Sequence, residues 1–154
     1  MSVFAGSAID HIGIAVSDTS YSQAFYEPVL RPLGITLVMS IEADPPGRKP
    51  RRLGFGSGGT PFFWLHDASV ASHGVHIALI APSRESVDAF HTAGIAAGGR
   101  DNGPPGIRPH YHADYYAAYV LTPDGVNLEA VCQVSAYVLT PDGVNLEAVC
   151  QVAS

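Results

Sequence analysis

The chain has 154 residues, of which 47% are hydrophobic and 14% are charged, and its formal net charge is −6 at pH 7. These values indicate one globular domain with a sizeable core and exclude a disordered chain. They also exclude a basic surface for nucleic acid, and no apolar run approaches the roughly 20 residues that cross a membrane. Because no basic segment precedes the apolar residues at the N-terminus, no signal peptide is indicated, and we expect a cytoplasmic protein.

The first half of the chain predicts a strand, a helix and three further strands. Residues 8–16 alternate between an aliphatic face and a face of small residues that carries His11. The helix that follows can be capped by Ser17 or Asp18, and we expect its two prolines to kink or end it before a glycine. The three further strands are expected at 35–43, 52–55 and 62–67.

The second half repeats this order. A constant offset along the sequence superimposes His76 on His11, and the strand that carries His76 is followed by a helix with Ser83 as its capping residue. We therefore predict an α+β fold of two βαβββ modules, about residues 8–67 and 73–134. Each module forms a curved mixed sheet with one helix on one face, and the other faces are expected to meet across a shared cleft.

A segment of seventeen residues occurs twice, at 118–134 and at 136–152, with no difference between the copies. Cys132 and Cys150 are therefore one cysteine counted twice, which excludes a disulfide framework. One position in a sheet holds only one copy. We predict that the first copy occupies it, because the second would require a loop of about eighteen residues with a cost in loop-closure entropy.

The predicted domain is therefore residues 1–135, and residues 136–154 are a duplicated copy of its last strand segment. Glu129 belongs to the first copy, and Glu147 is its displaced duplicate. An apolar, strand-forming segment carries unpaired edges. Three placements stay open for the duplicate: it can lie on the surface, add to a sheet edge, or replace the equivalent strand of a neighbouring subunit.

Two histidines and one glutamate form a candidate metal site. His11 and His76 lie at matching positions on the first strand of each module, and each has a small residue beside it on its own face. Glu129 follows a Pro-Asp-Gly turn and lies between apolar neighbours on the last strand. A carboxylate in such a strand is costly to bury unless it is paired or binds a metal.

Three segments, IDHIGIAV, VHIALIAPSRESVDAFH and TPDGVNLEAV, resemble the vicinal oxygen chelate superfamily over about residues 8–133. This superfamily includes glyoxalase I, extradiol dioxygenases, fosfomycin-resistance enzymes and bleomycin-binding proteins. The resemblance implies that His11, His76 and Glu129 are metal ligands. At the position of the fourth ligand of glyoxalase I, the resemblance places Trp64, whose indole cannot bind a metal. The four-ligand arrangement is therefore absent here unless His66 substitutes for that ligand. Two histidines and one carboxylate are the set typical of non-haem Fe(II) oxygenases.

The extradiol dioxygenase signature of a His, an apolar residue with Tyr, and a Pro-x-Gly turn before Glu also has counterparts here. The resemblance implies that His110 or His112 is an acid/base or oxygen-binding group and that Tyr119 donates a hydrogen bond to a substrate oxygen. Ala118 departs from the signature, which has a larger apolar residue there. The alternative interpretation is a polar loop whose aromatic residues cover the sheet.

Together these patterns predict a metal-dependent enzyme in which one divalent ion, Fe, Mn, Ni or Zn, binds two adjacent oxygens of a small substrate. The alternative is a metal-free small-molecule binding protein that resembles bleomycin-sequestering proteins, and a third possibility is a folded protein whose site the duplication has damaged. We expect a homodimer, and exchange of the duplicated segment between its subunits stays open. An aromatic wall for a flat ligand can be built from Phe62, Trp64, Tyr111, Tyr115 and Tyr116.

Overall fold

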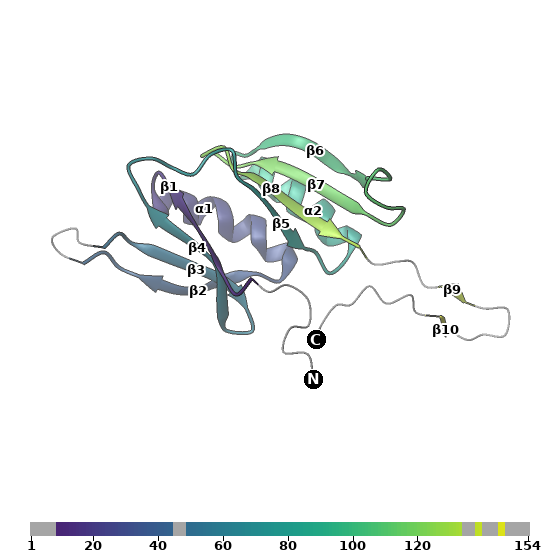
Figure 1. The fold of residues 1–154 in the computed structure, drawn as a ribbon, viewed down its shortest axis with the longest axis horizontal. Coiled ribbons are helices and arrows are strands. Elements are labelled where there is room, and N and C mark those ends of the chain that lie inside the picture. Colours follow the sequence, from purple (N-terminus) through teal and green to yellow (C-terminus); the bar gives the residue numbers. More distant parts are fainter. Residues whose placement is uncertain (1–8, 45–48, 134–137, 140–144, 147–154) are drawn as a thin grey trace.

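The computed structural model describes residues 9–44, 49–133, 138–139 and 145–146. The first module contains β1 (Ile12–Val16), α1 (Thr19–Leu30), the 3-10 turn η1 (Arg31–Leu33), β2 (Thr36–Ile41), β3 (Arg52–Ser57) and β4 (Thr60–Asp67). The second contains β5 (His76–Ile80), α2 (Arg84–Ala96), β6 (Arg100–Ile107), β7 (Tyr116–Leu121) and β8 (Asn127–Cys132). The α+β fold of two βαβββ modules is confirmed (Figure 1).

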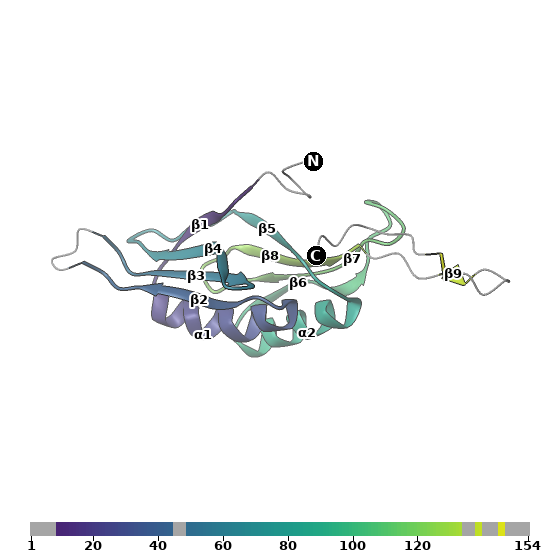
Figure 2. The ribbon, with the colours of Figure 1, turned by 90° about the horizontal axis from the view of Figure 1, so that it is seen from below.

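Each module forms a four-stranded mixed sheet, and the two sheets are not closed into a barrel. The strand orders are β1-β4-β3-β2 and β5-β8-β7-β6, and the first strand of each sheet runs parallel to its neighbour while the other pairs are antiparallel. Both helices lie on the same side of the two sheets (Figure 2). Among the described residues, the opposite faces of both sheets therefore carry no helix.

The sequence offset that relates His11 to His76 also holds for the strand pairing of the two modules. Ile12 pairs with Phe63 in the first sheet, and the residues at the same offset, Ile77 and Leu128, pair with each other in the second. The antiparallel pairs of β3 with β4 and of β7 with β8 follow the same offset. In β1, β4 and β3 and in their counterparts β5, β8 and β7, residues that correspond by this offset thus occupy the same place.

The helix ends agree with the capping signals in the sequence. Asp18 caps α1, because its side-chain oxygen accepts hydrogen bonds from the backbone N–H groups of the next turn at 2.7 and 2.9 Å. The helix continues through Pro28 and ends two residues later, and Pro32 lies in η1. Gly34, with φ of 74°, then turns the chain toward β2 in a left-handed conformation that favours glycine. Ser83 caps α2.

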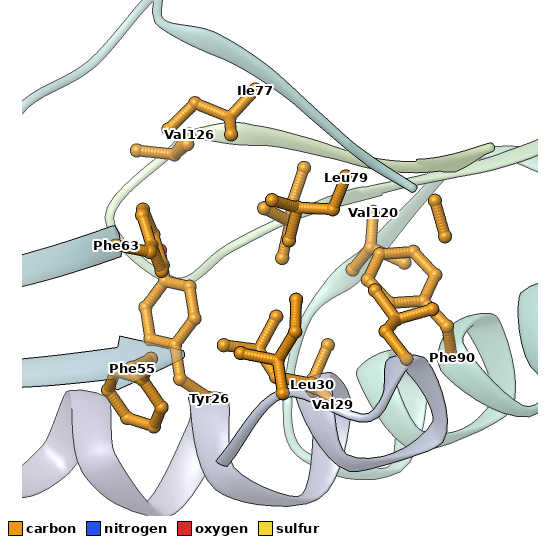
Figure 3. Close-up of a cluster of buried hydrophobic side chains, with 14 of the residues drawn as sticks. Tyr26, Val29, Leu30, Phe55, Phe63, Ile77, Leu79, Phe90, Val120 and Val126 are labelled. Atoms are coloured by element: carbon orange, nitrogen blue, oxygen red, sulfur yellow. The ribbon is translucent and has the colours of Figure 1, made fainter. Parts of the chain in front are cut away.

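A single hydrophobic core lies between the helices and the two sheets. Figure 3 shows Tyr26 and Leu30 of α1 and Phe90 of α2 facing side chains from the sheets, among them Phe63 and Leu79. Residues of both modules belong to this cluster, so the two modules share a core. In the part of the chain that the structure describes, no helix has the length and apolar character that a membrane span requires.

The strand β6 is the one element of the second module without a clear sequence signal. It contains Gly-Pro-Pro-Gly at 103–106, and proline cannot donate a hydrogen bond to a neighbouring strand. The structure accommodates Pro104 and Pro105 because β6 is the outermost strand of its sheet, and its pairing with β7 is interrupted by register shifts at this point.

The first copy of the duplicated segment forms the end of β7 and all of β8, as predicted. The described residues of the second copy form β9 (Val138–Leu139) and β10 (Asn145–Leu146), a separate antiparallel pair. The pairing of β9 with β10 repeats a pairing within the first copy, that of the corresponding residues Val120 and Leu121 with β8. Glu147 lies outside the described residues.

Candidate functional site

Glu129 lies on the helix-free face of the second sheet. Its neighbours Leu128 and Ala130 on β8 belong to the core, so the alternation of a strand directs Glu129 to the other face. It is nevertheless only 1% exposed. Ionised carboxylates are buried to this degree only when partners compensate the loss of water.

Two side chains supply this compensation. Nε2 of His76, on the adjacent strand β5, lies 2.8 Å from Oε2 of Glu129, and the hydroxyl of Tyr115 donates a 2.6 Å hydrogen bond to Oε1. The His76 side chain is 51% exposed, whereas the carboxylate is covered. The structure therefore brings together two of the three predicted metal ligands and leaves the imidazole accessible.

Tyr119 is the third polar side chain at this position. It lies directly opposite Glu129 in the pairing of β7 with β8, and its ring centre is 6.1 Å from that of His76. Burial, and next the charge of Glu129, raise the pKa of Tyr119 to about 12. Burial and the hydrogen bond to Glu129 raise the pKa of Tyr115 above its ordinary value. Both phenols are consequently protonated near neutral pH and can act as hydrogen-bond donors.

The two candidate acid/base histidines lie on the loop that connects β6 with β7. The ring centres of His110 and Tyr111 are 4.2 Å apart with the planes tilted by 46°, and the Tyr111 ring in turn lies 4.8 Å from that of Tyr115, tilted by 47°. His112 meets the edge of the Tyr115 ring at 5.3 Å, and its Nδ1 accepts a hydrogen bond from a backbone N–H. Both histidines are exposed. The loop is thus linked to Glu129 through the ring of Tyr115.

The first sheet has no carboxylate at the corresponding place. Trp64 pairs with Gly13 and Gly54 on either side, as Glu129 pairs with Ala78 and Tyr119 in the second sheet. A Cβ atom at Gly54 would lie 2.9 Å from the Trp64 ring, which shows that the indole covers this glycine. His66 is half-buried two residues further along the same face.

His11 does not join His76 and Glu129 within the chain. It precedes β1, its side chain is 61% exposed, and its Nδ1 lies 2.6 Å from a carboxylate oxygen of Asp10. Among the described residues, no three His, Cys, Asp or Glu side chains lie close enough together to hold a metal ion. One chain as described therefore supplies two adjacent donors.

These two donors fit a divalent metal. Imidazole nitrogen and carboxylate oxygen are ordinary ligands of Fe, Mn, Ni and Zn. Atoms 2.8 Å apart can both lie about 2.1 Å from one ion at an angle of about 85°, close to that between adjacent octahedral positions. Tyr115 would remain bound to the second carboxylate oxygen, as is typical of groups that orient a ligand.

The sequence predicted Tyr115 as part of an aromatic wall, but not as the partner of Glu129. In the sequence, Tyr115 stands some way before Glu129, and no pattern relates the two residues. Tyr116 is wrongly placed in that wall. Its hydroxyl bonds Asp88 on α2 at 2.7 Å, and Arg84 lies 5.2 Å above its ring, because Tyr116 belongs to the face of β7 that meets the helix.

These two tyrosines also explain which copy of the duplicated segment is seated. Both stand just before the first copy, separated from it by Ala117, and both make the contacts described above. Seating the second copy would bring Gln133 and Val134 to their positions, because these residues stand in the same place before the second copy. Neither side chain can replace a phenol hydroxyl at the same reach, so the first copy keeps two hydrogen bonds that the second would lose.

Comparison with known proteins gives a consistent family. The family model described as "Glyoxalase/Bleomycin resistance protein/Dioxygenase superfamily" matches residues 8–130. A glyoxalase/bleomycin resistance protein from Albidiferax ferrireducens T118 is 32% identical in sequence, with a TM-score of 0.67 over 82% of this chain and 98% of that one. None of the curated proteins searched matches the chain.

Two further structures share the fold at lower identity. Glyoxalase I from Zea mays is 22% identical with a TM-score of 0.61, and the match covers 80% of this chain but only 45% of that one. A mutant of the fosfomycin resistance protein FosX from Listeria monocytogenes, in complex with Mn(II) and 1S,2S-dihydroxypropylphosphonic acid, is 20% identical with a TM-score of 0.59. That match covers 84% of this chain and 93% of the other.

Proposed function

Because the chain belongs to the glyoxalase/bleomycin resistance protein/dioxygenase superfamily, we propose that it is a small-molecule metalloenzyme of the vicinal oxygen chelate type. The proposal rests above all on the 2.8 Å approach of His76 to a carboxylate that is 1% exposed. A buried carboxylate of this kind, beside an accessible imidazole, is expected where a cation binds. FosX, which shares the fold, binds Mn(II).

The proposed ligands are His76 and Glu129 together with His11 of a second copy. Within the described chain His11 contacts Asp10 instead, so a partner is a simple source of the third ligand. The helix-free face of β5 supports this arrangement, because Ile80 on that face is 75% exposed. A large apolar side chain left open beside a polar site is typical of a surface that another protein covers.

The bound ion would act as a Lewis acid on two adjacent oxygens of the substrate. The residues of the chain have distinct tasks beside it. Tyr119 keeps its proton at neutral pH, since its pKa is raised to about 12, and it donates a hydrogen bond to a substrate oxygen. His110 or His112 moves a proton at the rim, where both are exposed. Tyr115 holds the carboxylate of Glu129 in place.

The decisive experiment is elemental analysis of the metal content per chain. The protein is purified without oxygen and loaded with Fe(II), Mn(II), Ni(II) or Zn(II), in parallel with His76→Ala and Glu129→Ala. About one ion per parent chain is expected, with loss of the ion in both variants. His73→Ala, which removes an exposed histidine close to His76 in the sequence, should keep the metal. A parent that takes up none of the four metals would refute the proposal.

Mixing two defective chains tests the origin of the third ligand. Neither His11→Ala nor His76→Ala alone should bind the ion. If His11 comes from the partner, a dimer of one chain of each kind contains one intact site, and metal binding returns when the two are mixed. No return, despite dimers in analytical ultracentrifugation, would mean that His11 acts within its own chain or not at all. The preferred metal then guides the substrate search, toward catechols for Fe(II) or Mn(II) and toward thiol adducts of 2-oxoaldehydes for Ni(II) or Zn(II).

A metal-free binding protein is the second candidate, and the cluster of the rings of His110, Tyr111 and Tyr115 favours it. Three rings with successive centres 4.2 and 4.8 Å apart form an aromatic surface beside the site. Such surfaces bind flat ligands. Fluorescence titration with bleomycin, before and after removal of metal, separates the two functions: metal-independent binding, together with the absence of stoichiometric metal, would favour the binding protein.

A further inference from the structure

Arg108 is fixed in place at the margin of the candidate site. It follows β6 directly, and its backbone N–H donates a 2.7 Å hydrogen bond to the carbonyl of Tyr115. Its Nη2 donates a 2.6 Å hydrogen bond to the carbonyl of Pro104, and its guanidinium carbon lies 5.4 Å from the ring centre of Tyr119. A long and ordinarily mobile side chain is thus held at both ends.

Two glycines of β6 make room for this guanidinium. A Cβ atom at Gly103 would lie 3.4 Å from Nη2 of Arg108 and 2.8 Å from the Tyr119 ring, and a Cβ atom at Gly106 would lie 3.2 Å from Nη1. Any larger residue would therefore press on the arginine or on the tyrosine. The strand β6 thus has no side chain at Gly103 and Gly106, the two positions next to the guanidinium.

The positive charge of Arg108 has no carboxylate within ion-pair distance among the residues that the structure describes. Arg51, by contrast, is paired with Glu42 at 3.4 Å. Arg108 is half-buried, and Pro104 accepts from one of its five N–H donors. A half-buried guanidinium with donors to spare is suited to bidentate binding of a carboxylate or phosphate group.

Tyr119 connects this charge with the candidate metal ligands. The ring that Arg108 covers lies 6.1 Å from the His76 ring and pairs across the strands with Glu129. A small molecule that reaches His76 can therefore also reach Arg108. We propose that Arg108 determines substrate specificity by binding an anionic oxygen group, a carboxylate or a phosphate, of the molecule that the site takes up. This inference rests on the proposed function, because it places the substrate beside the same ligands.

The test uses the metal-free protein and two simple anions, acetate and inorganic phosphate, at low ionic strength. Nuclear magnetic resonance follows the Arg108 side-chain N–H and the Tyr119 amide during titration. For at least one anion we expect saturable shifts with a Kd on the order of 1 mM, and at least a tenfold weaker Kd in Arg108→Gln. Acetate identifies a site for planar carboxylates, and phosphate one for tetrahedral groups. Arg108→Lys, which keeps the charge but loses the planar fork, should fall between parent and Arg108→Gln.

Arg84→Gln is the matched control, because Arg84 also lies over a tyrosine ring, at 5.2 Å, but on the helix side of the same sheet. It removes the same charge and should leave the anion affinity unchanged. The inference is overturned if neither anion gives saturable shifts in the parent up to about 50 mM, well above the expected Kd. It is equally overturned if Arg84→Gln weakens binding as much as Arg108→Gln, since the effect would then follow net charge alone.

A second measurement links the anion to the metal ligands. With Mn(II) loaded, the resonance of the anion that binds, phosphorus for phosphate or the carboxyl carbon for acetate, should broaden in the parent and much less in Arg108→Gln, while both chains hold the same amount of metal. Broadening that is equal in both chains would overturn the role of Arg108. A parent that binds anions but no metal would refute the proposed enzyme and leave the anion site standing, so the two failures are distinguishable.

Discussion

The hydroxyl of Tyr115 donates a 2.6 Å hydrogen bond to Oε1 of Glu129, and the other carboxylate oxygen lies 2.8 Å from Nε2 of His76. The carboxylate is therefore held from two sides by groups on different elements, a loop and a strand. Because the pKa of Tyr115 is raised, first by burial and then by Glu129 itself, the phenol stays protonated and continues to donate. This arrangement holds Oε1 through the phenol and leaves Oε2 to the side chain of His76.

Replacing Tyr115 with Phe should weaken metal binding while the fold is kept. Loss of a hydrogen bond that orients a ligand typically lowers metal affinity by about 10–100-fold. We expect this loss in competition with a chelator, together with a decrease in the free energy of unfolding of about 1–3 kcal/mol, because Oε1 of a buried carboxylate loses its donor. Tyr111→Phe, which alters a 59% exposed neighbour in the same ring cluster, is the control. Unchanged affinity in Tyr115→Phe would show that Tyr115 has no part in positioning Glu129.

Titration of Tyr119 should lower the stability at alkaline pH. Its pKa in the folded chain is about 12, raised mainly by burial, against about 10 for an unfolded tyrosine. The folded state thus retains the proton more tightly, so the stabilisation is complete below about pH 10 and is lost as the pH rises toward about 12. Urea unfolding from pH 8 upward should show a smaller alkaline loss of stability for Tyr119→Phe than for the parent. Tyr21→Phe, at a 58% exposed ring, is the control, and parallel curves for parent and Tyr119→Phe would contradict the prediction.

The sequence pattern was sufficient to assign Glu129 and His76 to their strands and sheet faces. Strand alternation and the correspondence between the modules can both be recognised in short stretches of sequence. The alternation of β8 put Glu129 opposite the core residues Leu128 and Ala130, and the structure confirms this. The offset that related His11 to His76 also holds for the pairing of the strands. Such patterns can be detected in a single sequence because each needs only a few consecutive residues.

Contacts made by irregular segments could not be predicted in this way. Tyr115 and Arg108 lie at the two ends of a loop, and what they reach depends on how that loop folds back on the sheet. The strand β6 was hidden by Pro104 and Pro105, which are tolerated only because the strand lies at the edge. These features follow from tertiary packing, which neither periodicity nor turn signals encode.

The glycines on either side of Trp64 should respond differently to alanine. A Cβ atom at Gly54 would lie 2.9 Å from both the Trp64 ring and the Pro61 side chain, whereas one at Gly13 would be in ordinary contact with Trp64 at 3.8 Å. Gly54→Ala should therefore lower the free energy of unfolding by about 1–3 kcal/mol, as overpacking does, and Gly13→Ala should change it little. Urea unfolding and the fluorescence of Trp64, the one tryptophan of the chain, report both effects. Equal stability of the two variants would mean that the indole moves away at no cost.

Removal of the second copy of the duplicated segment should leave the fold and the site intact. Both four-stranded sheets are complete by Cys132, and the residues that hold Glu129 precede the second copy. A chain that stops after Ser135 should keep its free energy of unfolding within about 0.5 kcal/mol and its metal content unchanged. Deletion of residues 118–135 is the control, because it joins Ala117 to Ala136 and restores the same sheet sequence, so both single-copy chains should behave alike. If both lost stability or metal relative to the parent, the second copy would have a structural task, such as pairing with a neighbouring subunit.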